Sequence, residues 1–121
     1  MNNKIKKFED LNVWKLGMNV TAAVYEELKN CKDFGLRDQL QRAAVSIPSN
    51  IAEGFERNTN KDFIRFLYIA KSSSGELRTQ LYLCRKMRLI PEKNCKHLIK
   101  QTRKISAMIY KLIQTRYEHF S

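Results

Sequence analysis

This sequence is poor in the residues that would hold it together through disulfides or a metal ion. It has three cysteines, an odd number, and no Cys-x-x-Cys pair, so neither a disulfide framework nor a zinc site is expected. Its two histidines, His97 and His119, follow Asn94 and Arg116 by three positions, so the Glu-x-x-His motif of di-iron bundles is missing. We therefore expect free thiols, no metal ion and no cofactor.

Glycine and long apolar runs are also scarce. The four glycines are scattered, so no glycine-rich phosphate loop is present, and no serine has the histidine and aspartate partners of a catalytic triad. Nowhere do eighteen apolar residues run together, and the basic N-terminus lacks the apolar stretch of a secretory signal. These absences predict a cytoplasmic protein that has no membrane partner and is not an enzyme.

Acidic residues are scarce in only one half of the chain. The 121 residues carry a formal net charge of +11. Residues 1–60 hold nine Lys or Arg against eight Asp or Glu, whereas residues 61–121 hold fourteen against four. Such asymmetry favours a polyanionic partner, most often nucleic acid, although charge alone indicates only nonspecific binding and solubility.

Helical apolar spacing predicts four long helices in a single domain, over about residues 11–30, 36–56, 61–88 and 91–119. Asp10 and Thr59 are expected to cap the first and third helices, and Pro91 fits the first turn of the fourth. Short connections between long amphipathic helices predict an all-α, antiparallel up-down-up-down four-helix bundle.

Each predicted helix has its own apolar seam. In chain order the inward residues are expected to be Leu11, Trp14, Met18, Thr21, Tyr25 and Leu28; Leu40, Ala43, Ala44, Ile47, Ile51 and Phe55; Phe63, Phe66, Leu67, Ala70, Ser73, Ser74, Leu77, Leu81 and Cys84; and Cys95, Leu98, Thr102, Ile105, Ile109, Leu112 and Arg116. Further apolar residues widen two of the faces and favour a subunit interface: Val13, Leu16, Val20, Ile99, Met108, Tyr110 and Ile113.

The most unusual segment, residues 39–54, has Pro48 in the middle of a predicted helix. An interior proline costs about 3 kcal/mol and frees a carbonyl, which neighbouring hydroxyl or amide groups are expected to satisfy. We predict a kink at Pro48. A structural polar network, inside the bundle or at a subunit contact, is expected from Arg42, Ser46, Asn50, Glu53 and Glu76. The alternative, acid–base catalysis by Glu53 and Glu76, is disfavoured because no histidine or other evident partner accompanies them.

The block from Arg42 to Gly54, with shorter matches at residues 8–11, 13–15 and 61–63, resembles the small four-helix-bundle proteins encoded in intervening sequences of bacterial 23S rRNA genes. The resemblance covers about residues 8–90. It implies a ring-like homopentamer, and the family has no well-established biochemical activity. The fold is also shared by the accessory variability protein of diversity-generating retroelements, which works with a reverse transcriptase and nucleic acid. That likeness is a fold-level analogy only.

Basic residues recur at helical spacing on both sides of Pro91, and only Glu92 and Glu118 are acidic in the fourth predicted helix. An ordinary solvated face mixes charges, so RNA or DNA contact through phosphates is favoured. The expected contact residues are Arg78, Arg85, Lys86, Arg88, Lys93, Lys96, Lys100, Arg103 and Lys104. Tyr110, Tyr117 and Phe120 are candidates for base stacking, although such residues more often pack. The alternative function is a scaffold that docks an acidic or apolar partner protein.

Overall fold

A computed structural model describes residues 4–120 of the chain. It contains a short 3-10 helix, η1 (Phe8–Asp10), and four α-helices: α1 (Asn12–Leu28), α2 (Phe34–Phe55), α3 (Asn60–Lys86) and α4 (Glu92–Phe120). No strand occurs within the described range. The predicted all-α architecture of four long helices is therefore confirmed.

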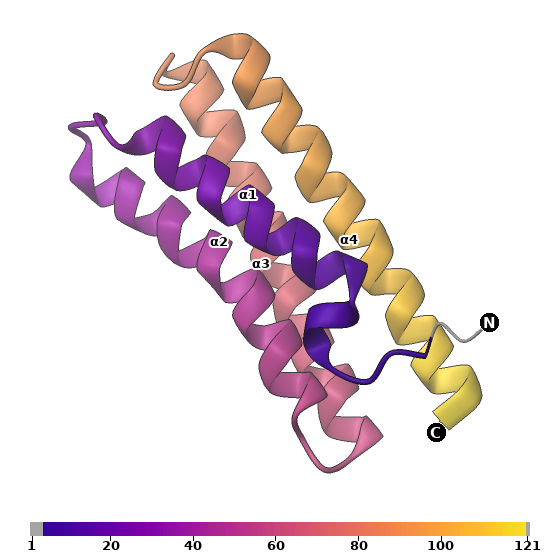
Figure 1. The fold of residues 1–121 in the computed structure, drawn as a ribbon. Coiled ribbons are helices and arrows are strands. Elements are labelled where there is room, and N and C mark those ends of the chain that lie inside the picture. Colours follow the sequence, from indigo (N-terminus) through magenta and orange to yellow (C-terminus); the bar gives the residue numbers. More distant parts are fainter. Residues whose placement is uncertain (1–3, 121) are drawn as a thin grey trace.

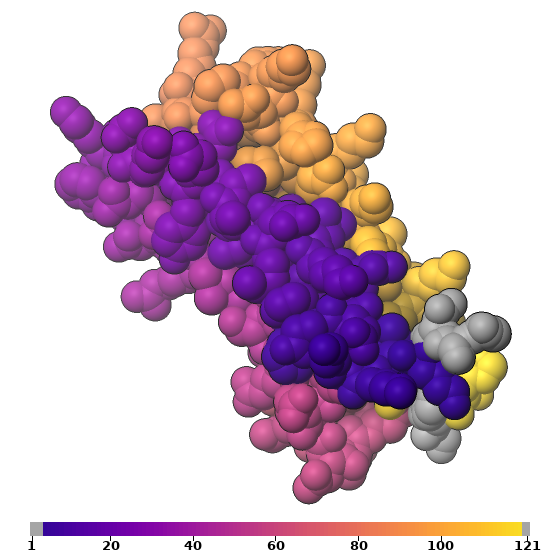
Figure 2. Space-filling view, in the orientation of Figure 1, coloured from indigo at the N-terminus to yellow at the C-terminus, as the bar shows by residue number. Residues whose placement is uncertain are grey.

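The four helices pack around one shared core. Each packs against its neighbour in the chain, and α1 also packs against α4. Figure 1 shows the ribbon reversing direction at each connection. In the space-filling view, η1 and α1 cover the space between α2 and α4 on the side facing the viewer (Figure 2). Among the described residues, no helix is both long and apolar enough to cross a membrane.

The helix starts confirm one predicted cap and correct another. Thr59 caps α3, since its hydroxyl accepts a hydrogen bond from the Asp62 N–H at 3.1 Å. Asp10 does not cap α1. Its carboxylate instead accepts the N–H groups of Lys6 and Lys7, at 3.1 and 3.2 Å, because a 3-10 turn intervenes before α1 begins.

The other two helices begin within two residues of their predicted starts. The carboxylate of Asp33 accepts the Leu36 N–H at 3.2 Å, and α2 therefore begins two residues earlier than expected. Pro91 immediately precedes α4, and its carbonyl accepts the Cys95 N–H at 2.9 Å. A residue without an N–H fits this position because the first N–H groups of a helix have no intrahelical acceptor.

The predicted seams of α2, α3 and α4 are correct in outline, with Leu40, Ile47, Leu67, Leu81 and Ile109 fully buried. Phe55, Leu112 and Arg116 are only partly buried.

The seam predicted for α1 is correct at Leu28 and wrong at Met18 and Tyr25, which are 46% and 45% exposed. The buried positions of this helix are Val13, Gly17, Val20, Val24 and Leu28. These buried residues repeat at the same three-and-four spacing as the predicted seam. Spacing alone therefore cannot tell the buried stripe from the predicted one, and packing against α2 and α4 decides between them.

The residues expected to widen two faces into a subunit interface mostly belong to the core. Val13, Val20, Ile99 and Ile113 are all at most 4% exposed. Leu16 and Met108 are partly buried, which leaves only Tyr110 exposed among the seven. That assignment was wrong because a bundle helix contacts two neighbours and so needs an apolar face wider than a single seam.

Pro48 lies inside α2 and is buried. It has no N–H to donate to the carbonyl of Ala44, four residues earlier. The hydroxyl of Thr21, on α1, lies 3.0 Å from this oxygen and 2.8 Å from the carbonyl oxygen of Gly17. The expected compensation therefore comes from the neighbouring helix. The bend at Pro48 stays a prediction.

Candidate nucleic-acid interface

The connection between α3 and α4 is a tight turn that brings basic residues together. Arg88 has a φ of 57°, in the left-handed region where glycine is ordinarily favoured. The Leu89 N–H donates to the Cys84 carbonyl at 2.9 Å and the Arg88 N–H to the Arg85 carbonyl at 3.2 Å. These are the two hydrogen bonds of a Schellman motif. A cation therefore occupies the position in this motif that glycine fills at least cost.

Eight of the nine predicted phosphate-binding residues are exposed around this turn. We call them the basic end: Arg85, Lys86, Arg88, Lys93, Lys96, Lys100, Arg103 and Lys104. The only acidic residue between positions 85 and 104 is Glu92. Its carboxylate lies 3.3 Å from Arg85 and 3.5 Å from Lys96. Exposed ion pairs of this kind contribute little to stability, so they leave the basic end available to an anion.

Arg78, the ninth predicted residue, is engaged within the fold. Its guanidinium donates to the Thr102 hydroxyl at 3.2 Å and to the Ser106 hydroxyl at 2.7 Å. The Ser74 hydroxyl donates to the Thr102 carbonyl at 2.9 Å and accepts from Ser106 at 3.0 Å. Arg78 therefore holds α3 against α4 directly beside the basic end.

Tyr82 is a candidate that our reading of the sequence missed. Two shallow depressions meet at Tyr82 and Arg85, one extending towards Lys86 and Arg88 and the other towards Lys100 and Arg103. The Tyr82 side chain is 39% exposed, and its hydroxyl accepts a hydrogen bond from Arg103. The sequence did contain a signal for Tyr82. It follows Arg78 by four positions and precedes Arg85 by three, which places it on the basic side of the same helix.

The predicted polar network is only partly assembled. The Asn50 amide donates to both the carbonyl and the hydroxyl oxygen of Ser46, each at 2.8 Å. The Ser46 and Ser73 hydroxyls lie 2.8 Å apart and link α2 to α3. Ser73, a predicted seam position, therefore also belongs to this hydrogen-bonded group. Arg42 and Glu76 are exposed and lie outside this hydrogen-bonded group.

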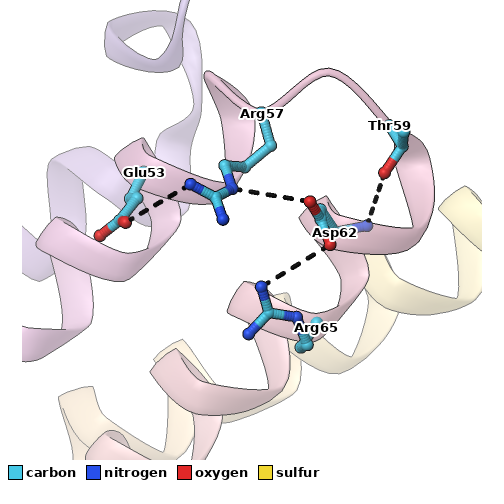
Figure 3. Close-up of polar contacts among 5 residues, drawn as sticks. All are labelled: Glu53, Arg57, Thr59, Asp62 and Arg65. Carbon is cyan, nitrogen blue, oxygen red and sulfur yellow. Dashed lines mark hydrogen bonds and ion pairs between the residues drawn. The ribbon is translucent and has the colours of Figure 1, made fainter.

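Glu53 belongs to a separate cluster at the connection between α2 and α3 (Figure 3). Its carboxylate lies 3.9 Å from Arg57, and Arg57 and Arg65 each lie 3.6 Å from Asp62. The two guanidiniums also sit 4.9 and 4.7 Å from the centre of the Phe66 ring. The cluster ties the start of α3 to the end of α2.

The residues considered for other chemistry are not brought together. Glu53 and Glu76 are both exposed, so no buried pair of carboxylates exists between them. In the described part of the chain, no three His, Cys, Asp or Glu side chains gather closely enough to hold a metal ion. Tyr110 and Tyr117 are 54% and 50% exposed. The side chain of Phe120, the third stacking candidate, lies outside the described residues.

The cysteines are free thiols. Cys84 and Cys95 are fully buried, and the Cys95 thiol donates to the Leu81 carbonyl at 3.1 Å. Burial raises the pKa of the Cys84 thiol from its ordinary 9.0 to about 11 and raises the pKa of Cys95 as well. Because the thiolate is the reactive form, these two residues act as small core side chains.

Comparisons with known proteins agree with the resemblance seen in the sequence. The chain matches the 23S rRNA-intervening sequence protein family over residues 9–111. Among solved structures it is similar to a protein of unknown function from the S23 ribosomal protein family of Bacteroides thetaiotaomicron VPI-5482, with a TM-score of 0.79 and 23% identity over 84% of this chain and 97% of the other. At that identity the likeness shows the fold alone. Comparison with curated proteins finds no match. The family match spans most of the chain, which therefore belongs to the 23S rRNA-intervening sequence proteins.

Proposed function

We propose that this protein is a non-enzymatic, homo-oligomeric nucleic-acid-binding protein whose basic end contacts phosphates. The observation that carries the proposal is the charge at the turn between α3 and α4. Eight exposed cations lie between positions 85 and 104, where the sequence has one acidic residue, Glu92. From α1, the Glu27 carboxylate also reaches this end and accepts a hydrogen bond from the Asn94 amide at 2.8 Å. A face that serves only solubility ordinarily mixes both signs. Arg88 adds support, because it keeps a cation where the left-handed backbone favours glycine.

The expected mode of contact is electrostatic. Each phosphate neutralised by Lys or Arg releases counterions, so the affinity should fall steeply as salt rises. The basic end has the flexible cations that this mode requires, and the chain contains no recognised base-reading motif. We therefore expect recognition of charge and shape rather than of sequence.

The proposed oligomer is the ring of five that the family resemblance implies. Five copies would repeat the basic end and bind one long polyanion with greater avidity than a single copy. The exposed side chains of Met18 and Val45, on α1 and α2, offer apolar surface for a neighbouring copy. Light scattering on the purified protein tests the proposal, and a monomeric mass would contradict it.

The binding test compares two fourfold variants of equal charge. One changes Lys96, Lys100, Arg103 and Lys104 to glutamine, and the control changes Lys6, Lys15, Lys32 and Arg42, which are exposed elsewhere. Fluorescence anisotropy with labelled RNA, single-stranded DNA and duplex DNA across a salt series should show weaker binding and a flatter salt slope for the first variant only. Equal behaviour of the two variants would overturn the assignment of the basic end.

A second candidate function, a scaffold for a partner protein, is favoured by apolar side chains exposed outside the basic end. Phe34, Tyr68 and Ile69 are 58%, 48% and 39% exposed. Tyr68 and Ile69 are neighbours on α3, whereas Phe34 lies at the start of α2. Exposed apolar surface marks protein interaction sites. Affinity capture from a lysate with and without nuclease separates the two functions. A bound protein that survives nuclease favours the scaffold, and nuclease-sensitive material favours nucleic-acid binding.

A further inference from the structure

Four of the five tyrosines lie on α3 and α4 and are exposed. Tyr68 and Tyr82 are fourteen positions apart on α3, and Tyr110 and Tyr117 are seven apart on α4. Positions seven apart differ by only about 20° around a helix, so each pair lies on one face. On α4 the same seven-residue repeat continues backwards through Arg103. Each of these faces therefore runs along the helix as a single stripe.

Two separate depressions lie beside the stripes, one at each end of the face that α3 and α4 share. At one end, Tyr82 on α3 accepts a hydrogen bond from Arg103 on α4, and both line a depression with Lys96 and Lys100. At the other end, Tyr68 on α3 and Tyr117 on α4 line a second depression. Fourteen helical residues separate these ends along α3, which corresponds to about 21 Å.

Cations accompany the aromatic rings at both ends. Arg85, Lys96 and Lys100 line the depression that holds Tyr82. Lys61 and Arg65 line the depression that holds Tyr68 and Tyr117, where Asp62 lies 3.6 Å from Arg65. The hydrogen bond from Arg103 limits the ways in which the Tyr82 ring can turn. Exposed rings set among cations are how proteins bind single strands, because every unpaired base has a face that can stack and every nucleotide a phosphate.

We infer that the face shared by α3 and α4 binds single-stranded nucleic acid, with unpaired bases stacked on Tyr82 at one end and on Tyr68 and Tyr117 at the other. The inference rests on the proposed function, since the same strand uses the phosphate contacts of the basic end. It adds a preference for single strands over duplexes, whose bases are already stacked on one another.

The test uses the full chain and matched tyrosine variants. Tyr82→Leu removes the ring, Tyr82→Phe keeps the ring but loses the hydroxyl, and Tyr25→Leu makes the same change at an exposed tyrosine on α1, outside the face shared by α3 and α4. The probes are a fluorescein-labelled DNA single strand, an abasic strand of the same length and a duplex. A double Tyr68→Leu, Tyr117→Leu variant tests the far end.

We expect the unmodified protein to bind the single strand more tightly than either the abasic strand or the duplex. Tyr82→Leu should weaken single-strand binding by about 5- to 140-fold, the range for losing one stacked base, and leave abasic binding unchanged. The double variant should lose at least as much. Tyr82→Phe should retain most of the affinity, and Tyr25→Leu all of it.

Several results would overturn the inference. Equal affinity for the natural and abasic strands, or an equal loss in Tyr25→Leu, excludes stacking while leaving phosphate binding by the basic end intact. A changed oligomeric mass in Tyr82→Leu with unchanged affinity assigns the ring to a contact between copies. If the unmodified protein binds none of the probes, the proposed function fails together with the inference.

Discussion

At Gly54, α2 packs against α3 with no room for a side chain. A β-carbon there would lie 2.6 Å from Cβ of Phe66 and 3.1 Å from Cδ1 of Phe63. We expect Gly54→Ala to lower the free energy of unfolding by about 1–3 kcal/mol, since an overpacked helix contact must shift. The matched control is Gly75→Ala, in the middle of α3, where no atom lies within 4 Å of the added carbon. It should raise the free energy of unfolding by about 0.5–1 kcal/mol. Urea unfolding measures both, and changes of the same sign would contradict the packing argument.

Arg88 combines backbone strain with a charge at the basic end. Replacing it with glycine should raise the free energy of unfolding by about 1 kcal/mol, because the left-handed conformation costs other residues roughly that amount. The same change should weaken binding to single-stranded DNA and reduce the salt slope by about 0.7, the value for one phosphate. Arg88→Gln should weaken binding without the gain in stability. If Arg88→Gly is stabilised and binds normally, Arg88 is not a phosphate contact.

The buried Cys84 thiol should make stability depend on pH in the alkaline range. Its pKa is raised by burial from 9.0 to about 11 in the folded protein, so the unfolded chain loses this proton first as pH rises. The stabilisation is present below pH 9 and is lost as pH rises towards 11. Urea unfolding across this range should show a smaller decline for Cys84→Ala than for the unmodified protein. Parallel pH profiles would contradict the shift.

At the scale of the helix, Pro48 and Thr21 form one unit across α1 and α2. Thr21→Val should lower the free energy of unfolding by about 1–2 kcal/mol, because the carbonyl of Ala44 loses its donor. In a Pro48→Ala background the new N–H at position 48 can serve that carbonyl, so the same Thr21→Val change should cost less. A double-mutant cycle by chemical denaturation measures the coupling. Additive effects of the two changes would contradict it.

The α1 seam shows where the sequence stops predicting the fold. Two stripes on this helix have the same three-and-four spacing, one through Met18 and Tyr25 and one through Gly17 and Val24. The stripe through Gly17 is the buried one. At this position α1 lies so close to α2 that an added β-carbon would be 3.3 Å from Cγ2 of Ile47. Close approach between α1 and α2 selects the stripe with the small residue. Periodicity within one helix contains no information on that approach. The seams of α2, α3 and α4 offered no such competing stripe and were predicted correctly in outline.

In the candidate site, too, some features could be predicted from the sequence and others could not. Exposure of eight basic residues followed from helical spacing and charge alone. The engagement of Arg78 by Thr102 and Ser106 did not, because those hydroxyls belong to another helix. Tyr82 was missed for a similar reason, since its place beside Arg103 depends on how α3 and α4 are aligned. Features set by one helix are readable in the sequence, and features set between helices require the structure.

At the scale of the whole molecule, positive charge is concentrated on one pair of helices. Residues 61–121, which include nearly all of α3 and all of α4, hold fourteen Lys or Arg and four Asp or Glu, a net +10. Repulsion within this half should destabilise the fold at low ionic strength. We therefore expect the thermal unfolding midpoint to rise with added NaCl, as the Debye length shrinks from about 30 Å at 0.01 M to about 8 Å at 0.15 M.

The same charge predicts how a bound strand alters stability. Single-stranded DNA at 100 times its dissociation constant should add about 2.7 kcal/mol to the free energy of unfolding, provided the unfolded chain does not bind it. The variant with glutamine at positions 96, 100, 103 and 104 should show a smaller salt response and a smaller gain from DNA, because it has fewer charges to screen or neutralise. Differential scanning calorimetry of the two proteins, with and without DNA, measures both effects. Identical salt responses would mean that these four cations do not repel one another in the folded protein, and an identical gain from DNA would place the bound strand elsewhere on the molecule.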